Sequence, residues 1–238
     1  MINITTAPSD DVLYAKSKWW GFPDLPDDLD WPTVEAEDEG EVFDDPLTFV
    51  CQIRCEDLAE LDPEGLLPHE GMLYFFAALD YFLGDLDAFT APGMGEWPSE
   101  CFKVLYSPVE EGLNTHTLFY DEEDEIPACP APERIVFGQK MPDQVGHDGV
   151  YDVTPDPDRG AYTTMLGEPF TDETRLLGEP FTDEAREAMP GYISLLQIDE
   201  NDDWGLRFFD SGMLNFMIKP ADLAARRFDK VRAYLYSA

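Results

Sequence analysis

Two short strand patterns, each present twice and in the same order, constrain the fold of this chain most. The first pattern is TFVCQI at Thr48–Ile53, and it returns as SLLQI at Ser194–Ile198. The second is GMLYF at Gly71–Phe75, which returns as GMLNF at Gly212–Phe216. The spacing from the shared glutamine to the shared glycine is 19 residues in the first copy and 15 in the second, a difference that one loop can absorb.

A third landmark precedes each pair of strands. Gly21, Phe22 and Pro23 form a Gly-x-Pro in the first copy, and the second copy has another at residues 178–180. Three landmarks in one order indicate an internal duplication. Chance is the alternative, because short apolar strands resemble one another.

The duplication predicts two related halves. The first half spans residues 1–150 with its repeat at 17–77, and the second spans 151–238 with its repeat at 176–238. The boundary lies in the polar stretch Pro142–Gly160. The octapeptide LGEPFTDE occurs in tandem, at Leu166 and again at Leu177. The copy that adjoins the repeated strand fits the second half, so residues 166–176 are interpreted as an eleven-residue insertion.

The local patterns predict strands with a few short helices between them. Residues 191–236 suggest a strand, an acidic turn, two further strands, a short helix and a final strand. Helices are expected at Glu56–Leu61 and at Ala221–Phe228, where Pro220 can occupy a first helical turn. The predicted fold class is therefore α+β, with mainly antiparallel sheets and short helices.

The chain carries an extreme negative charge. It has 51 acidic against 15 basic residues, a formal net charge of −36. Nucleic acid and anionic membrane surfaces repel such a chain, so neither is an expected partner. No apolar run approaches membrane-spanning length and the N-terminus lacks a signal sequence, so a cytoplasmic location is expected.

The acidic residues gather in three clusters. Asp24–Asp45 contains no Lys or Arg, Asp121–Glu125 reads DEEDE, and Asp199–Asp203 follows a repeated strand. Such fields attract cationic partners and accelerate their association, and interleaved aromatic side chains can anchor them. The predicted partner-binding residues are Asp24, Asp27, Asp28, Asp30, Trp31, Glu35, Glu37, Asp38, Glu39, Glu41, Phe43, Asp44, Asp45, Asp199, Asp202, Asp203 and Trp204.

Solvation and cation binding would account for the acidity as well. Acid-rich surfaces keep proteins soluble and are typical of salt-adapted proteins. Salt-adapted proteins usually have fewer bulky apolar residues, however, whereas this chain keeps 16 Phe and 5 Trp. Asp199, Asn201 and Asp203 have the alternate spacing of a calcium loop, with Asp210 at its twelfth position. Trp204 stands where that loop requires glycine, so no metal site is predicted.

No pattern for catalysis or cofactor binding occurs. The chain lacks a nucleophile elbow, a P-loop, a nucleotide-binding glycine fingerprint and a zinc motif. Its three histidines are scattered. It has four cysteines, Cys51, Cys55, Cys101 and Cys129, of which Cys51 and Cys55 are expected to be buried thiols. We therefore expect a protein that is not an enzyme and holds no cofactor, although a small ligand between the two halves remains an alternative.

The sequence resembles the YwqG-like family of bacterial proteins, a domain of unknown function. The resemblance rests on SKWWGFPDLPDDLDWP at Ser17–Pro32, PLTFVCQI at Pro46–Ile53, GMLYFF at Gly71–Phe76, LLGEPFTDEAR at Leu176–Arg186, LLQID at Leu195–Asp199 and GMLNFMI at Gly212–Ile218. It implies an α+β fold of two related halves and no established reaction. Proteins resembling this family are found among candidate immunity proteins of bacterial toxin systems.

Charge and resemblance together predict a cytoplasmic immunity protein. Its acidic surface would block the active or substrate-binding cleft of a basic secreted toxin domain, for example a nuclease that binds phosphate backbones through basic residues. The alternative is a ligand-binding protein with a housekeeping role whose acidity serves only solvation.

Overall fold

The computed structural model describes residues 2–7, 9–79, 92–117, 131–139, 164–167, 189–199, 201, 206, 208–209 and 212–237. Most of the described strands belong to one sheet of eleven strands, and every pairing between described strands is antiparallel. In sheet order they are β8 (Gly95–Glu96), β15 (Arg232–Ser237), β14 (Gly212–Ile218), β13 (Ile193–Asp199), β12 (Thr164–Gly167), β1 (Ile2–Ala7), β11 (Glu133–Gln139), β2 (Lys18–Trp19), β6 (Thr48–Arg54), β7 (Met72–Ala77) and β9 (Phe102–Ser107).

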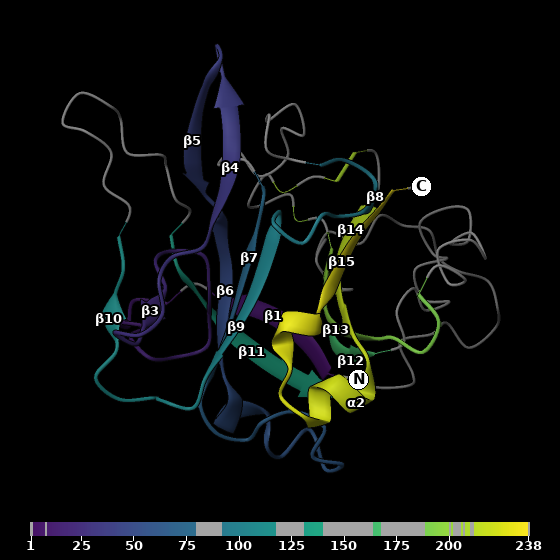
Figure 1. Ribbon diagram of the computed structural model, residues 1–238. Coiled ribbons are helices and arrows are strands. Elements are labelled where there is room, and N and C mark those ends of the chain that lie inside the picture. The colour runs from purple at the N-terminus through teal and green to yellow at the C-terminus, as the bar shows by residue number, and fades with distance from the viewer. Residues whose placement is uncertain are drawn as a thin grey trace.

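Two small sheets stand beside the large one (Figure 1). One is the hairpin of β4 (Thr33–Asp38) and β5 (Glu41–Pro46), and the other pairs β3 (Asp24–Leu25) with β10 (Asn114–Thr115). Helical structure among the described residues is limited to α2 (Pro220–Ala224) and two 3-10 turns, η1 (Cys55–Leu58) and η4 (Phe228–Lys230).

The α+β prediction is therefore wrong, because the described part of the chain is nearly all β. The helix expected at Glu56–Leu61 is the 3-10 turn η1, and the one expected at Ala221–Phe228 is the five-residue α2 followed by η4. Pro220 does occupy the first turn of α2. Helices this short form few hydrogen bonds of their own, whereas the long apolar runs pair along their whole length and bury their side chains.

The repeated strand patterns form the same hairpin twice. In the first, Gln52 pairs with Tyr74, and in the second Gln197 pairs with Asn215. Each hairpin has a bulge at the same place in its first strand, between Phe49 and Cys51 in β6 and between Ser194 and Leu196 in β13. Outward from the central β1–β11 pair, the sheet reads β12, β13, β14, β15 on one side and β2, β6, β7, β9 on the other.

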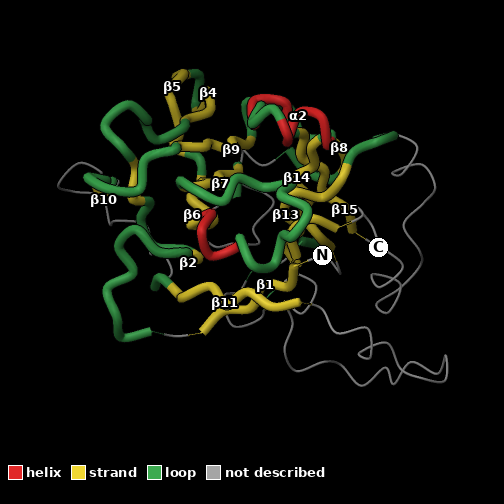
Figure 2. The backbone as a smooth tube through the Cα atoms, turned by 90° about the horizontal axis from the view of Figure 1, so that it is seen from below, coloured by secondary structure: helices red, strands yellow, loops and turns green. Residues whose placement is uncertain are grey.

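The sheet folds back on itself around one core. Phe75 of β7 and Phe216 of β14 occupy matching positions of the two hairpins, and their ring centroids are 5.4 Å apart. Six strands separate β7 from β14 in the sheet order, so this contact requires the two arms to face each other. Figure 2 shows the arms meeting across the interior, with β1 and β11 at the closed end. Both phenylalanines are fully buried.

The repeated glycine has a steric reason in both copies. A Cβ at Gly71 would collide with the carbonyl oxygen of Ser107 on the neighbouring strand, and one at Gly212 would collide with that of Tyr236. Glycine at these positions allows the strand to enter the sheet next to its neighbour.

The halves predicted at 1–150 and 151–238 remain a prediction. Within the sheet, β1 pairs with β11 of the predicted first half and with β12 of the second, and β8 of the first half extends the edge of β15. Of the insertion predicted at 166–176, only Leu166 and Gly167 lie within the described residues.

Candidate functional site

The hairpin of β4 and β5 carries most of the first acidic cluster and projects from the end of the folded sheet (Figure 1). Its strands pair in one continuous register from Thr33 opposite Pro46 to Asp38 opposite Glu41. The turn consists of Glu39 and Gly40, whose φ angles are +49° and +88°. Two positive φ angles in a two-residue loop are typical of a type I′ turn, which matches the twist of paired strands.

The two faces of the hairpin differ in exposure. Val34 and Ala36 alternate with Glu35 and Glu37 along β4, and the two apolar residues are buried while the two glutamates are exposed. In β5, all four residues Glu41–Asp44 are exposed. Val42 keeps 62% of its surface exposed and Phe43 keeps 39%. The hairpin thus rests on the protein through β4 and presents β5 to solvent.

Like charges face each other across the hairpin. Glu35 lies directly opposite Asp44, and both are exposed. Directly opposed charges of one sign destabilise a strand pair. No lysine or arginine occurs between Thr33 and Pro46 to offset them. Burial raises the pKa of the Asp45 carboxyl, nearer the root of the hairpin, so this group holds its charge at an energetic disadvantage.

The root of the hairpin is held by Trp31. Its indole N–H donates to the carbonyl oxygen of Leu47 at 2.8 Å, and the Leu47 N–H donates to the carbonyl oxygen of Pro32 at 2.9 Å. The Trp31 ring packs edge-on against Phe49 and Phe76, with centroids 6.5 and 5.7 Å away. Trp31 is expected from the sequence to contact a partner, yet in the structure it is partly buried and anchors the hairpin.

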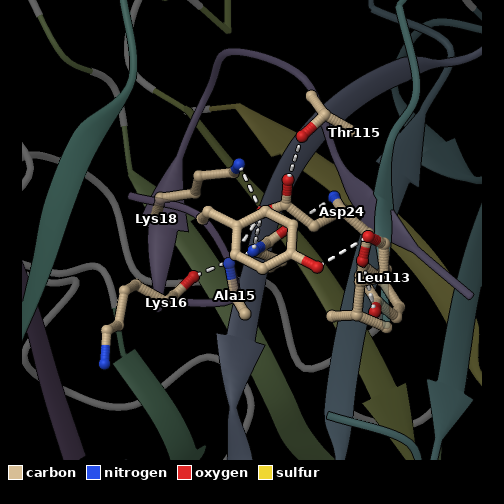
Figure 3. Close-up of polar contacts among 9 residues, drawn as sticks. Ala15, Lys16, Lys18, Asp24, Leu113 and Thr115 are labelled. Carbon is tan, nitrogen blue, oxygen red and sulfur yellow. Dashed lines mark hydrogen bonds and ion pairs between the residues drawn. The ribbon is translucent and has the colours of Figure 1, made fainter. Parts of the chain in front are cut away.

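Asp24 begins the same acidic cluster but lies in the interior (Figure 3). One carboxylate oxygen, Oδ2, accepts hydrogen bonds from Lys18 Nζ at 2.7 Å, Gln52 Nε2 at 2.8 Å and Ala15 N at 3.0 Å. The other, Oδ1, accepts from Thr115 Oγ1 at 2.7 Å. Asp24 and Lys18 form an ion pair whose side chains are 1% and 7% exposed.

The main chain of Asp24 is held as closely as its carboxylate. Its N–H donates to Gln52 Oε1 at 2.8 Å, and its carbonyl oxygen accepts from the Tyr74 hydroxyl at 2.7 Å. Gln52 Nε2 also donates to the Lys16 carbonyl oxygen at 3.0 Å. Gln52 and Tyr74 are cross-strand neighbours in the first repeated hairpin. Asp24 is thus bound to the sheet and is not part of the acidic surface.

The remaining acids of the segment lie on the loop between β3 and β4. Asp27, Asp28 and Asp30 are exposed, and Asp27 Oδ1 accepts a hydrogen bond from Asn114 Nδ2 at 2.6 Å. With the exposed Glu35, Glu37, Glu39, Glu41 and Asp44 they form what we call the hairpin acidic surface. The side chain of Asp38 lies outside the described part of the chain.

The third predicted cluster contributes no described surface. Asp199 is buried at the end of β13 and is 5% exposed. Asp202, Asp203 and Trp204 lie outside the described residues, and so do the second cluster at 121–125 and Asp210 of the calcium-loop pattern. Asn201 and Leu206, which both lie between β13 and β14, form an isolated antiparallel bridge.

The described residues hold no metal-binding group, and the cysteines among them are buried. No group of three or more His, Cys, Asp or Glu side chains among them is arranged to hold a metal ion. Cys51, Cys55 and Cys101 are buried, unpaired thiols, as was expected for Cys51 and Cys55, and burial raises the pKa of Cys55 to about 12. A thiol with so high a pKa has almost no thiolate at neutral pH and is a poor nucleophile. Cys129 lies outside the described residues.

Within its described segments the chain has no helix with the length and apolar character needed to cross a lipid bilayer.

The hairpin was detectable in the sequence but is not predicted there as a hairpin. Residues 33–46 alternate Val34 and Ala36 with glutamates, and a Glu-Gly pair precedes a second β-prone run. Gly40 at the second turn position is the signal for a two-residue turn. The burial of Asp24 has no comparable signal, because two of its four donors, Gln52 and Thr115, lie 28 and 91 residues away along the chain.

The family comparison covers nearly the whole chain. A family model described as "Domain of unknown function (DUF1963)" matches residues 17–236. The match spans both repeated hairpins, the Asp24 cluster and the hairpin acidic surface. No curated protein matches the chain in sequence.

Proposed function

The chain belongs to the DUF1963 family, whose function is unknown, and we propose a function from its structure. We propose that it is a binding protein that captures a basic protein partner on the hairpin acidic surface. One observation carries the proposal: an acidic hairpin projects from the fold, exposes all of Glu41–Asp44 and contains no basic residue. Charge concentrated on a projecting element raises the rate at which an oppositely charged partner is encountered.

The finer proposal is an immunity protein of the YwqG-like type, acting in the cytoplasm against a basic secreted toxin. A nuclease toxin recognises phosphate backbones through clusters of lysine and arginine. An acidic hairpin of this shape competes for such a cleft because it presents carboxylates at the regular spacing of a strand. The net charge of −36 supports the same choice of partner, since it disfavours binding to nucleic acid itself.

We propose binding without catalysis. The best organised polar cluster in the described chain surrounds Asp24, and four donors occupy its two carboxylate oxygens. Asp24 and Gln52 are fully buried, so a substrate has no access to them.

The test compares two variants of equal charge. The hairpin variant is E35Q/E37Q/E41Q/D44N, and the control, D10N/E60Q/E64Q/E111Q, neutralises four acids that are exposed elsewhere. Each protein is titrated against a panel of purified basic nuclease toxin domains at low and high salt. We expect the unmodified protein to form a complex whose affinity falls as the salt concentration rises. The control variant should keep this affinity, whereas the affinity of the hairpin variant should be lower by more than about tenfold.

Two outcomes contradict the proposal. Equal weakening by both variants would mean that only the overall charge matters. Failure of the unmodified protein to bind any member of the panel at low salt would favour a role of the acidity in solvation, or a ligand-binding role.

A further inference from the structure

The turn of the hairpin decides which main-chain groups of β5 are used inside it. In a two-residue hairpin loop, the residues that flank the turn form a hydrogen-bonded pair, here Asp38 and Glu41. Pairs then alternate between hydrogen-bonded and non-hydrogen-bonded along an antiparallel ladder. Phe43 therefore bonds to β4 through its main chain, whereas the N–H and C=O groups of Val42 and Asp44 point away from β4.

The outer side of β5 is an open sheet edge. Among the described strands, β5 pairs with β4 alone. Its residues Glu41–Asp44 are all exposed, including the β-branched Val42 at 62%. An exposed edge with free donors and acceptors is a template for another strand, and proteins guard such edges with charges or proline. In β5 the protective residues are the carboxylates of Glu41 and Asp44, together with Pro46 at the end of the strand.

We propose that β5 receives one strand of its basic partner, which extends the hairpin to a three-stranded sheet. This inference rests on the proposed capture of a basic protein and adds how that partner is held. The main-chain groups of Val42 and Asp44 would supply affinity, and the side chains beside them would supply specificity.

The faces of the hairpin define the chemistry of the added strand. Glu35, Glu37, Val42 and Asp44 share one face, because Glu35 pairs with Asp44 and Glu37 with Val42. A strand added next to β5 places alternate side chains on this face. Lysine or arginine opposite Asp44 would relieve its repulsion with Glu35, and an apolar residue opposite Val42 would cover that exposed side chain. The partner segment therefore carries a cationic residue and an apolar, β-forming residue two positions apart on this face.

The same carboxylates exclude a second copy of this chain. Pairing two β5 strands would bring Glu41 and Asp44 of one copy close to the same acids of the other, and like charges in opposed positions destabilise such a sheet. The edge is therefore protected against self-association while it stays open to a basic strand.

The first test changes the probe and leaves the protein intact. An eight-residue peptide with the repeat Lys-Thr-Val-Thr places lysine and valine two positions apart on one face. It is compared with the same peptide N-methylated at every second residue, which has equal charge but cannot pair along one edge. We expect the N-methylated peptide to bind at least about tenfold more weakly, since it loses two main-chain hydrogen bonds. Hydrogen exchange should slow at the Val42 and Asp44 amides with the first peptide only. Equal affinity of the two peptides, or no protection at these amides, would overturn strand addition.

The second test uses the variant Val42→Pro. Proline removes an outward N–H and leaves the hairpin charges and the bonds to β4 in place, whereas Phe43→Pro removes a donor inside the hairpin. We expect Val42→Pro to keep slow exchange at the Phe43 amide and to lose the tenfold preference for the unmodified peptide. A retained preference would overturn strand addition.

These outcomes are separate from those that test the capture of a basic protein. The toxin domains could bind Val42→Pro as tightly as they bind the unmodified protein, but bind E35Q/E37Q/E41Q/D44N more weakly. In that case the proposed function stands and strand addition is contradicted. If neither change affects the toxin domains, both proposals fall.

Discussion

Asp24 and Asp44 begin and nearly end the same acidic segment, yet they meet opposite environments. Asp24 is fully buried, with four donors on its carboxylate and an ion pair to Lys18. Asp44 is exposed on a projecting strand and faces Glu35. The Asp24 carboxylate stabilises the fold through its hydrogen bonds and ion pair. The Asp44 carboxylate adds to the negative electrostatic field of the hairpin, which contains no basic residue to offset it.

The difference shows that the charge of a segment does not decide its role. A buried carboxylate is tolerated only where donors converge on it, and the first repeated hairpin supplies them through Gln52 and Tyr74. On the hairpin acidic surface the carboxylates are exposed to solvent, and Asp27 also accepts a hydrogen bond from Asn114. Because they are exposed, these acids contribute little to stability.

The largest effect is expected where the buried ion pair is broken. Asp24→Ala leaves the Lys18 ammonium buried without a counter-ion, and we expect the free energy of unfolding to fall by about 3–5 kcal/mol in a urea titration. The control Asp28→Ala removes an exposed acid of the same segment and should change it by less than about 0.5 kcal/mol. Similar losses in both variants would erase the distinction between the two environments.

A smaller effect is expected at the root of the hairpin. Trp31→Ala removes the ring packed on Phe49 and Phe76 and the hydrogen bond to Leu47, and it should lower the free energy of unfolding by about 2 kcal/mol. Hydrogen exchange should accelerate in β4 and β5 but not in β7. Val42→Ala, at an exposed position, is the control. Unchanged exchange in the hairpin would show that something other than Trp31 holds it.

Reversing one charge of the Glu35–Asp44 pair is expected to affect stability and binding in opposite directions. Glu35→Lys places a cation opposite Asp44, which should stabilise the hairpin by about 0.5 kcal/mol while weakening capture of a basic partner. Asp28→Lys makes the same change of net charge outside the hairpin and should not stabilise it. A Glu35→Lys variant that binds as tightly as the unmodified protein would remove Glu35 from the proposed surface.

The smallest effect is a pH dependence at Asp45. Burial raises the folded-state pKa of this carboxyl above its unfolded value, so its ionisation at neutral pH opposes folding. The penalty disappears as the pH falls through the raised pKa. Because Asp45 is only partly buried, we expect Asp45→Asn to be more stable than the unmodified protein by roughly a few tenths of a kcal/mol near neutral pH. The two proteins should converge only below about pH 4, where the carboxyl is protonated in both the folded and the unfolded state. A gap that widens on acidification would contradict the assigned cause.

The repeated strands could be predicted because their information is local. TFVCQI and SLLQI are apolar runs long enough to form buried strands, and their partners begin with glycines that a neighbouring strand requires. The α+β prediction failed because good helix formers near Pro220 continued for only five residues as a helix. Helix propensity is only a weak guide to structure, because the tertiary context of a segment, here the strands β14 and β15 on either side of it, can override the propensity.

The candidate site was only partly predictable. The exposed acids of the hairpin lie in the segment that the charge indicated, but Trp31 proves to be an anchor and Asp24 a buried acid. Neither role has a signal in the local sequence, because both depend on side chains contributed by other strands of the sheet.

The sequence by itself determined the charge of this protein, its two repeated strand pairs and the acidic segment from Asp24 to Asp45, since composition and period-two patterns are properties of neighbouring residues. Only the tertiary structure decided which of those acids meet water and which meet Lys18, Gln52 and Thr115. The physical reason is that a carboxylate takes its role from the donors and the solvent around it, and folding brings those donors from distant parts of the chain.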